Sequence, residues 1–412
     1  MASDIDTKWP MLPLREIALK IQDGTHFSPK MGGHDYRYVT SRNIGAGYLK
    51  LQNVEMISEA EHRKIYGRCD VKYGDLLLTK DGANTGNAAI STFREEVSLL
   101  SSVAFVRCDP RKATEAYLLQ YLLSEVGNRQ ITDAMSGNAI TRLTLGKINA
   151  LTLPVPHVSE QREIAAALSA VDALVYSLER LIAKKQAIKQ GMMQQLLTGK
   201  IRLSGFSGEW VAVAAGDIAS FRGGSGFPIR YQARKSGAYP FFKVSDMNNE
   251  GNELFMRRAN NYISADTRKL IGAVVMPRDA IVFAKVGAAV FLERKRILGQ
   301  VSCIDNNMAA MTIDPSRADV RFVHYLLMNF SMSSLVSTTA LPSLNGGQLR
   351  SIPVRLPSEI AEQRAIADLL ADADAELDLL QGQLSKARLV KQGMMQELLT
   401  GRIRLDTAKA TV

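Results

Sequence analysis

The sequence predicts an α+β fold in which two mixed α/β domains alternate with two long helices as a tandem repeat. The peptide KQGMMQQLLTGKIRL at 189–203 returns as KQGMMQELLTGRIRL at 391–405, about 200 residues later. A helical pattern of apolar residues precedes each copy. The remaining segments carry short β-like runs separated by turn residues. A chain of 412 residues also exceeds what one hydrophobic core usually serves.

The repeat extends upstream of this peptide in both halves of the chain. EQREIAAAL at 160–168 matches EQRAIADLL at 362–370, and proline-containing segments precede both. Further upstream the match weakens but keeps its order, and Trp9 corresponds to Trp210. The sequence therefore indicates a duplication with similar ends and diverged interiors. We expect it to divide the chain into 1–157, 158–203, 204–357, 358–405 and a tail at 406–412.

Each interior is expected to form a mixed α/β domain. The first contains β-like runs such as YRYVT, DLLLT and VAFVRC, and the second contains YPFFKV and AIVFAKV. Turn signals such as Asp81-Gly82 and Gly223-Gly224 separate these runs. Short helices are expected at ATEAYLLQYLLSEV and ADVRFVHYLLMNF.

The segment that follows each interior is expected to be one long helix. Apolar residues recur there in steps of four and three, which is typical of a helical stripe. At about 1.5 Å per residue each helix would be about 55 to 60 Å long. Gly199 and Gly401 are suited to end the helices. The stripe comprises Ile164, Leu168, Val171, Val175, Leu178, Ile182, Met192 and Leu196 in the first helix, and Ile366, Leu370, Ala373, Leu377, Leu380, Leu384, Ala387, Met394 and Leu398 in the second.

A helix of this length needs a partner to bury its stripe, and the other copy is the obvious one. We therefore expect an intramolecular coiled coil. The alternative, in which each helix lies along its own domain, stays open at this point. The paired methionines at 192–193 and 394–395 favour core packing over a docking surface.

Composition favours a globular protein with a polyanionic partner. Lysine and arginine exceed aspartate and glutamate by 51 to 41, and 46% of the residues are hydrophobic. An inert basic surface is the alternative. No segment has the length and apolarity of a membrane helix, and MASDIDTKWP lacks the features of a signal peptide. Three widely spaced cysteines argue against a zinc knuckle or a disulfide framework and fit a reducing cytoplasm.

Polar and basic residues on glycine-rich turns of the interiors are the candidates for DNA contact, because such loops can offer hydrogen bonds to phosphates and to base edges. Each residue alone is a weak indication, and an ordinary turn is the alternative for each. The candidates are Arg37, Arg42, Thr79, Lys80, Asn84, Thr85, Asn138, Thr141 and Arg142 in the first interior, and Arg222, Arg230, Lys243, Asn248, Asn249, Lys285, Ser343 and Asn345 in the second.

Signatures of catalysis are missing from the sequence. It contains no GxxxxGK[ST] phosphate loop, and RGGSGF at 222–227 lacks the strand and helix of a dinucleotide site. No Pro-Pro pair occurs, so the Asn/Asp-Pro-Pro-aromatic motif of amino-methyltransferases is absent. The five histidines have no metal-binding spacing. We therefore expect no catalytic site and no metal site.

Two diverged interiors alternating with two nearly identical helices, each beginning with EQR.IA and ending with LLTG.IRL, resemble the specificity (S) subunit of type I restriction-modification enzymes. The resemblance covers essentially the whole chain. It implies that each interior is a target recognition domain for one half of a bipartite, asymmetric DNA site. It also implies that the two helices form an antiparallel coiled coil that sets the spacing between the half-sites, with a pseudo-two-fold relation between the copies.

The same resemblance implies partners for the helices. Two methyltransferase (modification) subunits would bind there and supply S-adenosylmethionine for adenine methylation, and restriction subunits would bring ATP, Mg²⁺, translocation and cleavage. This chain would hold no cofactor and catalyse neither reaction. The class of protein opposed to this interpretation is a coiled-coil scaffold with two protein-binding domains and no DNA.

The second helix begins with acidic residues that the first lacks. We expect this acidic start to pair with the basic part of the first helix in an antiparallel arrangement, although a solvated basic face is the alternative. The residues concerned are Asp368, Asp372, Asp374, Glu376 and Asp378 in the second helix, and Lys184, Lys185 and Lys189 in the first.

Overall fold

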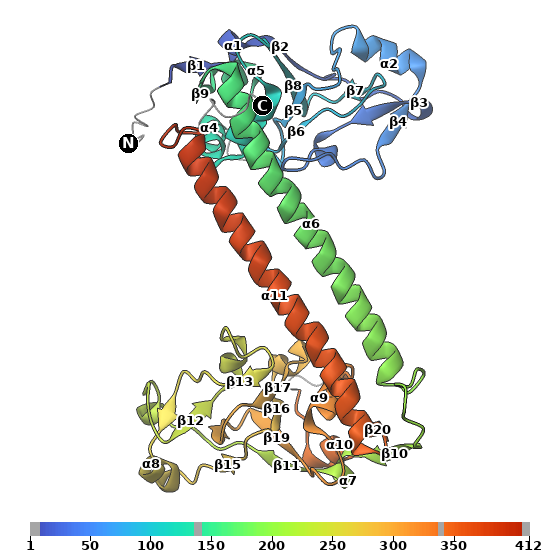
Figure 1. The fold of residues 1–412 in the computed structure, drawn as a ribbon, viewed down its shortest axis with the longest axis vertical. Coiled ribbons are helices and arrows are strands. Elements are labelled where there is room, and N and C mark those ends of the chain that lie inside the picture. Colours follow the sequence, from blue (N-terminus) through green and yellow to red (C-terminus); the bar gives the residue numbers. More distant parts are fainter. Residues whose placement is uncertain (1–8, 136–141, 337–341, 406–412) are drawn as a thin grey trace. The chain divides into compact units, whose positions relative to one another are not determined.

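The computed structural model describes residues 9–135, 142–336 and 342–405. Its contacts divide the chain into two compact units. The first unit contains the residues up to Arg180 together with those from Gln381 onward, and the second contains Leu181–Leu380 (Figure 1). Each unit therefore holds one α/β domain and part of both long helices. The domain boundaries expected from the sequence stay predictions, since this division falls inside the helices.

The first domain is built on two sheets and a short strand pair. β1 (Met11–Pro13) pairs antiparallel with β9 (Thr152–Pro154). The larger sheet has the order β2-β8-β5-β6, formed by Ala18–Asp23, Val103–Cys108, Leu76–Thr79 and Ala88–Ile90, and all its pairs are antiparallel. The smaller sheet has the order β4-β3-β7, formed by Glu55–Ile57, Met31–Val39 and Ser98–Leu99. The helices are α1 (Leu14–Ile17), η1 (Ser41–Asn43), α2 (Glu59–Tyr66), α3 (Glu115–Leu123), α4 (Glu125–Ala134) and α5 (Leu145–Ala150).

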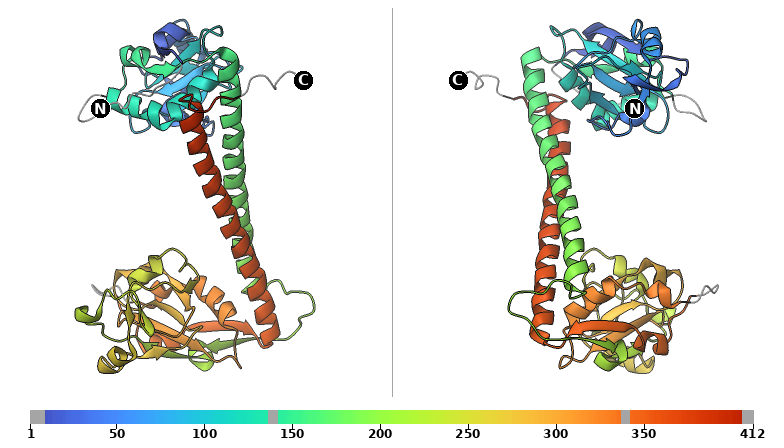
Figure 2. Two further views of the ribbon diagram at one scale, coloured as in Figure 1. Left: turned by 60° about the vertical axis from the view of Figure 1, so that its left-hand side comes forward. Right: turned by 90° about the vertical axis from the view of Figure 1, so that its right-hand side faces the viewer.

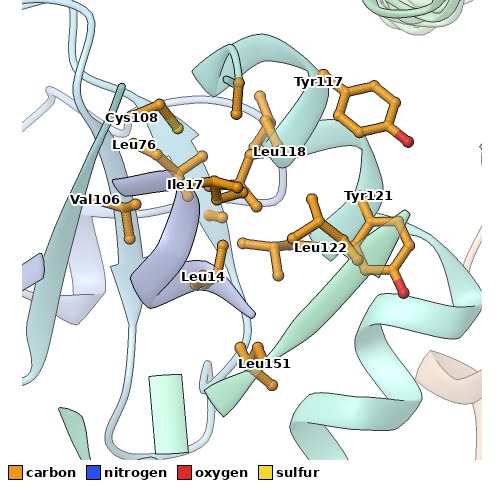
Figure 3. Packing of buried hydrophobic residues seen from close by; sticks show 14 of the residues in the cluster. Leu14, Ile17, Leu76, Val106, Cys108, Tyr117, Leu118, Tyr121, Leu122 and Leu151 are labelled. Carbon is orange, nitrogen blue, oxygen red and sulfur yellow. The ribbon is translucent and has the colours of Figure 1, made fainter. Parts of the chain in front are cut away.

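The core of the first domain lies between the larger sheet and α3. Leu76 and Val106 of the sheet point toward Leu118 and Leu122 of α3, and Leu14 of α1 lies among them (Figure 3). These side chains are at most 2% exposed. The VAFVRC run is buried on both faces, which explains why it has no alternation of apolar and polar residues.

The second domain repeats this plan with different additions. β10 (Trp210–Ala214) pairs with β20 (Pro353–Pro357), as β1 pairs with β9. The larger sheet has the order β11-β19-β16-β17-β13, formed by Ala219–Gly223, Met308–Ile313, Ile281–Ala284, Lys295–Leu298 and Phe255–Met256. The smaller sheet has the order β14-β12-β18-β15, formed by Tyr262–Ile263, Tyr239–Phe242, Ser302–Ile304 and Val275–Met276. The helices are α7 (Ala215–Ile218), η2 (Ile229–Tyr231), η3 (Val244–Asn248), α8 (Ala265–Leu270), η4 (Ala288–Leu292), α9 (Val320–Met328), η5 (Met332–Leu335) and α10 (Gly346–Arg350).

The two long helices pair antiparallel within each unit, as predicted. They are α6 (Val158–Leu196) and α11 (Ile360–Leu398), and they lie side by side in both views of Figure 2. In the first unit, Asp172 forms an ion pair with Lys391 at 2.5 Å, and Glu179 forms one with Arg388 at 2.6 Å. Residue numbers therefore increase along α6 in the direction in which they decrease along α11. The predicted stripe is buried at Ile164, Leu168, Leu178, Ile182 and Leu196, and at Ile366, Leu370, Leu380, Leu384, Ala387 and Leu398.

The second unit confirms the expected pairing between basic and acidic parts of the helices. Lys185 Nζ lies 2.6 Å from Glu376 Oε1, and Lys189 forms an ion pair with Asp374. Tyr325 of α9 donates a hydrogen bond of 2.8 Å to the other oxygen of Asp374. Lys184 is exposed and forms no ion pair with the residues that the structure describes. Two of the three lysines therefore behave as predicted.

The predicted glycines follow shortly after the ends of both helices, at Leu196 and Leu398, and have positive φ angles. Gly199 has φ +71° and Gly401 φ +72°, a conformation that costs residues with a Cβ atom. A Cβ on Gly199 would lie 3.0 Å from the Trp210 ring, and one on Gly401 would lie 3.2 Å from the Trp9 ring. The glycines therefore let the chain turn closely against the tryptophan that begins each domain.

The glutamine of each EQR motif joins the helix to its domain. Gln161 is fully buried, accepts a hydrogen bond of 2.9 Å from Thr114 N at the start of α3, and donates to Pro156 O at 2.9 Å. Gln363 does the same with Asp319 N at 2.8 Å and Pro357 O at 2.8 Å. A buried amide with satisfied donors and acceptors fixes the direction in which each helix leaves its domain.

Candidate nucleic-acid interface

A cluster of charged side chains, of which Lys80 and Asp23 are buried, lies at the end of β5 in the first domain. Lys80 follows β5 and is 2% exposed, and its Nζ lies 3.3 Å from Asp23 Oδ2 and 3.4 Å from Asp81 Oδ2. Arg142 reaches the same cluster, with its Nε 3.3 Å from Asp81 Oδ1. The two cations and two carboxylates compensate each other, which the buried Lys80 and Asp23 require, whereas the Arg142 side chain is 53% exposed. The cluster therefore holds together β2, the end of β5 and the chain at Arg142.

The burial of Thr79 and Lys80 does not support DNA contact by these two residues. The sequence placed both on a turn, but β5 continues through Thr79, which is fully buried. In the turn that follows, Thr85 Oγ1 donates a hydrogen bond of 2.6 Å to Gly82 O and stabilises the turn. Asn84 is exposed at the same turn. Among these four candidates, Asn84 presents its side chain to solvent.

The other candidates of the first domain are separate from this cluster or lie outside the described residues. Arg37 is in β3 and forms an ion pair with Glu95, which compensates its charge. Arg42 is exposed in η1. Asn138 and Thr141 lie outside the described residues.

Lys285 and Ser343 are brought together in the second domain. Lys285 follows β16 and is half-buried, and its carbonyl accepts a hydrogen bond of 2.8 Å from Leu344 N. The neighbouring Val286 and Ser343 form a β-bridge, and Ser343 is exposed. Two predicted residues that are far apart in the sequence thus lie close together.

Three further basic candidates of the second domain lie on separate elements. Arg222 is exposed in β11. Arg230 is exposed in η2, with its guanidinium 5.0 Å from the centre of the Tyr231 ring. Lys243 is half-buried and donates a hydrogen bond of 3.2 Å to Gln232 Oε1. These residues contribute positive charge to the domain surface.

The asparagine candidates of the second domain include two with structural roles. Asn249 Nδ2 donates a hydrogen bond of 3.1 Å to Arg258 O and so stabilises a turn. Asn345 caps α10 by accepting a hydrogen bond of 2.9 Å from Gln348 N. Asn248 is exposed at the end of η3. The ordinary turn that was the alternative for each candidate describes Asn249, whereas Asn345 is the N-cap of a helix.

Sequence reasoning missed the acidic residues of the charge cluster. Asp23 is 3% exposed, and its Oδ2 also lies 3.2 Å from His26 Nε2. The sequence marked Asp81-Gly82 only as a turn. The signal that could have found the acidic residues is the presence of a lysine at the end of a buried strand, which requires a carboxylate nearby.

Two kinds of site are missing from the described parts of the chain. Across 9–135, 142–336 and 342–405, no three His, Cys, Asp or Glu side chains are grouped to hold a metal ion. None of the helices described there is both long enough and apolar enough to cross a membrane.

Two α/β domains on one plan, each completed by the ends of two long helices, define a protein with a tandem repeat of one domain type. The chain matches the family described as "Type I restriction modification DNA specificity domain" twice, over residues 9–190 and 207–388. The chain therefore belongs to this family and carries two copies of its domain. It is 22% identical over 379 residues to the type I restriction enzyme MjaVIII specificity subunit of Methanocaldococcus jannaschii. The matched region covers 88% of this chain and 84% of that subunit.

Solved structures share the fold. The S subunit of a type I restriction-modification system from M. genitalium matches 97% of this chain and 98% of its own with a TM-score of 0.62 and 14% identity. A chain from a structure concerning complex assembly and conformational transition of the type I R-M system matches 96% of this chain and 98% of its own, with a TM-score of 0.56 and 17% identity. These comparisons do not favour a scaffold without DNA.

Proposed function

We propose that this chain is the DNA specificity subunit of a type I restriction-modification complex, in which each α/β domain reads one half of a bipartite, asymmetric site. The observation that carries the proposal is that the specificity domain of this family occurs twice, on one backbone plan. The repeated backbone plan is consistent with two domains that bind DNA in the same way. Divergence of the loop residues fits two half-sites with different base edges to be contacted.

Comparison of the two domains supports the proposal that they read different half-sites. The turn after β5 carries Asn84 and Thr85, whereas the matching segment after β16 contains η4, which carries Phe291 and Leu292, 58% and 55% exposed. A polar turn offers hydrogen bonds, and an apolar one can contact thymine methyl groups. The two domains therefore have the chemistry to recognise different sequences.

The paired helices are proposed to set the distance between half-sites and to bind two methyltransferase subunits. Support comes from large apolar side chains on α6 and α11 that stay exposed outside the buried stripe, as at protein interfaces. These are Leu174, Tyr176, Leu181 and Ile188 on α6, and Leu369, Leu379, Leu389 and Val390 on α11, with exposures from 38% to 68%.

The chain itself is proposed to be non-catalytic. S-adenosylmethionine would be bound by the methyltransferase subunits, and ATP and Mg²⁺ by restriction subunits. This assignment rests on the family resemblance and on the absence of phosphate-loop and methyltransferase motifs from the sequence.

A salt titration of DNA binding tests the proposal. The full chain is mixed with random double-stranded DNA, and retention of the DNA on a filter is measured from low to high salt. We expect the affinity to fall steeply with salt, because each phosphate that the protein neutralises releases counterions. A chain that retains no DNA at low salt would favour the scaffold with two protein-binding domains.

A further inference from the structure

Lys80 and Lys285 occupy equivalent backbone positions in the two domains. Lys80 N donates to Ser102 O at 2.9 Å, and Lys285 N donates to Asn307 O at 2.8 Å. The carbonyl of Lys80 accepts a bond of 2.8 Å from Leu143 N, just as that of Lys285 accepts one from Leu344 N. Lys80 follows β5, which pairs with β8, and Lys285 follows β16, which pairs with β19. In each domain, β8 or β19 is the strand of the larger sheet that comes last in the sequence.

The same strand register identifies Gly223 as the counterpart of Asp23. Asp23 ends β2 and lies opposite Ala104 of β8, whereas Gly223 ends β11 and lies opposite Ala309 of β19. Ala104 pairs with Leu78, which lies two positions before Lys80, and Ala309 pairs with Phe283, which lies two positions before Lys285. Ala104 and Ala309 are therefore equivalent positions. The carboxylate that compensates the first lysine is therefore replaced by a glycine in the second domain.

The second carboxylate of the cluster is replaced as well. Asp81 and Arg142 form a β-bridge in the first domain, and Val286 and Ser343 form the equivalent bridge in the second. The first domain thus places two carboxylates and an arginine around its lysine, and the second places a glycine, a valine and a serine there. Only the lysine is common to both sites.

Lys285 is accordingly an uncompensated cation. It forms no ion pair with the described residues, and its Nζ lies 2.8 Å from the point that a Cβ on Gly223 would occupy. Its side chain is half-buried, whereas that of Lys80 is 2% exposed. A half-buried lysine without a counter-charge is suited to bind an anion, and a compact ammonium suits a phosphate group.

We propose that Lys285 binds a phosphate of the DNA backbone at the half-site of the second domain, whereas its counterpart Lys80 is a structural ion-pair residue that does not touch DNA. This proposal rests on the proposed function and deepens it. It makes the two domains unequal, because the same backbone position binds DNA in one and stabilises the fold in the other.

Two substitutions at different positions test the role of Lys285. Lys285→Met removes the charge. Gly223→Asp restores the carboxylate that the first domain has at this place, and its Cβ meets only the movable end of the lysine side chain. Filter binding of random duplex DNA to the full chain gives the slope of the logarithm of affinity against the logarithm of salt concentration. Each substitution is expected to reduce that slope by about 0.9, the value for one phosphate, and to weaken binding roughly eight-fold at 0.1 M salt.

The matched controls separate charge from packing. Gly223→Ser adds a Cβ without a charge and should leave the slope unchanged. Lys80→Met should lower the melting temperature, because Asp23 and Asp81 lose the buried cation between them, and should leave the slope of the folded protein unchanged.

The possible results distinguish this proposal from the function on which it rests. If the original chain binds DNA with a steep salt dependence while folded Lys285→Met and Gly223→Asp proteins have the same slope and affinity, Lys285 does not bind phosphate, and the proposed function stands. A lower slope in Lys80→Met would contradict the structural role of Lys80. If the original chain binds no DNA, the proposed function itself fails.

Discussion

Arg404 donates two hydrogen bonds to the Glu160 carboxylate, from Nε at 2.9 Å and from an Nη atom at 2.7 Å, across 244 positions of sequence. Arg202 makes the same pair of bonds with Glu362, at 2.6 and 2.7 Å. The arginine of each IRL sequence therefore binds the glutamate of the other copy's EQR motif. This exchange explains why the peptide occurs twice, since each copy completes the unit that the other copy begins.

The Arg404 pair predicts a coupling that can be measured. Glu160 is 2% exposed, so Arg404→Gln leaves a buried carboxylate without its cation and should lower the melting temperature by a few degrees. Glu160→Gln removes the charge that needs compensation, so the double variant should be less destabilised than the sum of the single variants. Thermal melting of the four proteins measures this difference, and additive effects would show that the two side chains do not interact.

The helix-ending glycines predict opposite effects for two kinds of alanine substitution. Gly199→Ala and Gly401→Ala should each lower the free energy of unfolding by roughly 1–2 kcal/mol, because a Cβ disfavours positive φ. Gly191→Ala and Gly393→Ala serve as controls within α6 and α11, where no atom lies within 4 Å of the added Cβ. These should raise it by roughly 0.5–1 kcal/mol. Denaturant titration measures both, and equal effects at all four positions would contradict the assigned helix ends.

The ion pair between Lys185 and Glu376 predicts a modest, salt-dependent effect. Lys185→Glu should destabilise the protein by about 0.5 kcal/mol at low salt, since partly exposed pairs contribute little. Adding Glu376→Lys should restore the stability by recreating the pair in reverse. Lys184→Glu is the control, because Lys184 lies one position away and forms no ion pair with the described residues. Thermal melting at low and high salt would refute this pairing if the reversed pair were no more stable than the single variant.

We expect the buried His324 to make the folded protein less stable as the pH is lowered. Burial lowers the pKa of His324 to about 4 from 6.5. Between these values the unfolded chain binds a proton at this side chain that the folded protein does not, so stability falls as the pH falls from 6.5 to 4. The effect amounts to roughly 3 kcal/mol at the lower limit.

Removing the imidazole should remove this part of the pH dependence. We expect the free energy of unfolding of His324→Gln to change less steeply than that of the original chain over this window, because glutamine keeps a donor for Lys295 O but does not titrate. His157→Gln, at an exposed histidine, is the control. Identical pH profiles for the original chain and His324→Gln would show that His324 is not responsible.

The repeated parts of the fold could be predicted from the sequence because their signals are local. The apolar stripe of Ile164 and Leu168 follows from helical periodicity, and Gly199 follows from the way in which helices end. The pairing of Lys189 with Asp374 was predictable once the helices were taken as antiparallel, because a basic stretch then meets an acidic one.

The candidate interface was less predictable because burial there depends on contacts between distant strands. Lys80 and Lys285 look alike in the sequence, and the difference between them comes from Asp23 and Gly223 on a neighbouring strand. The strand pairing that aligns these two residues is a property of the folded sheets. Thr79 was predicted on a turn because nothing local marks the last residue of β5.

The most direct test of the proposed function is to map modified adenines in the DNA of a host that produces this chain together with a methyltransferase subunit. We expect modification at one bipartite sequence, with two defined halves at a fixed spacing, and no such modification when this chain is omitted. Modification that does not depend on this chain, or that occurs at a single uninterrupted sequence, would contradict it.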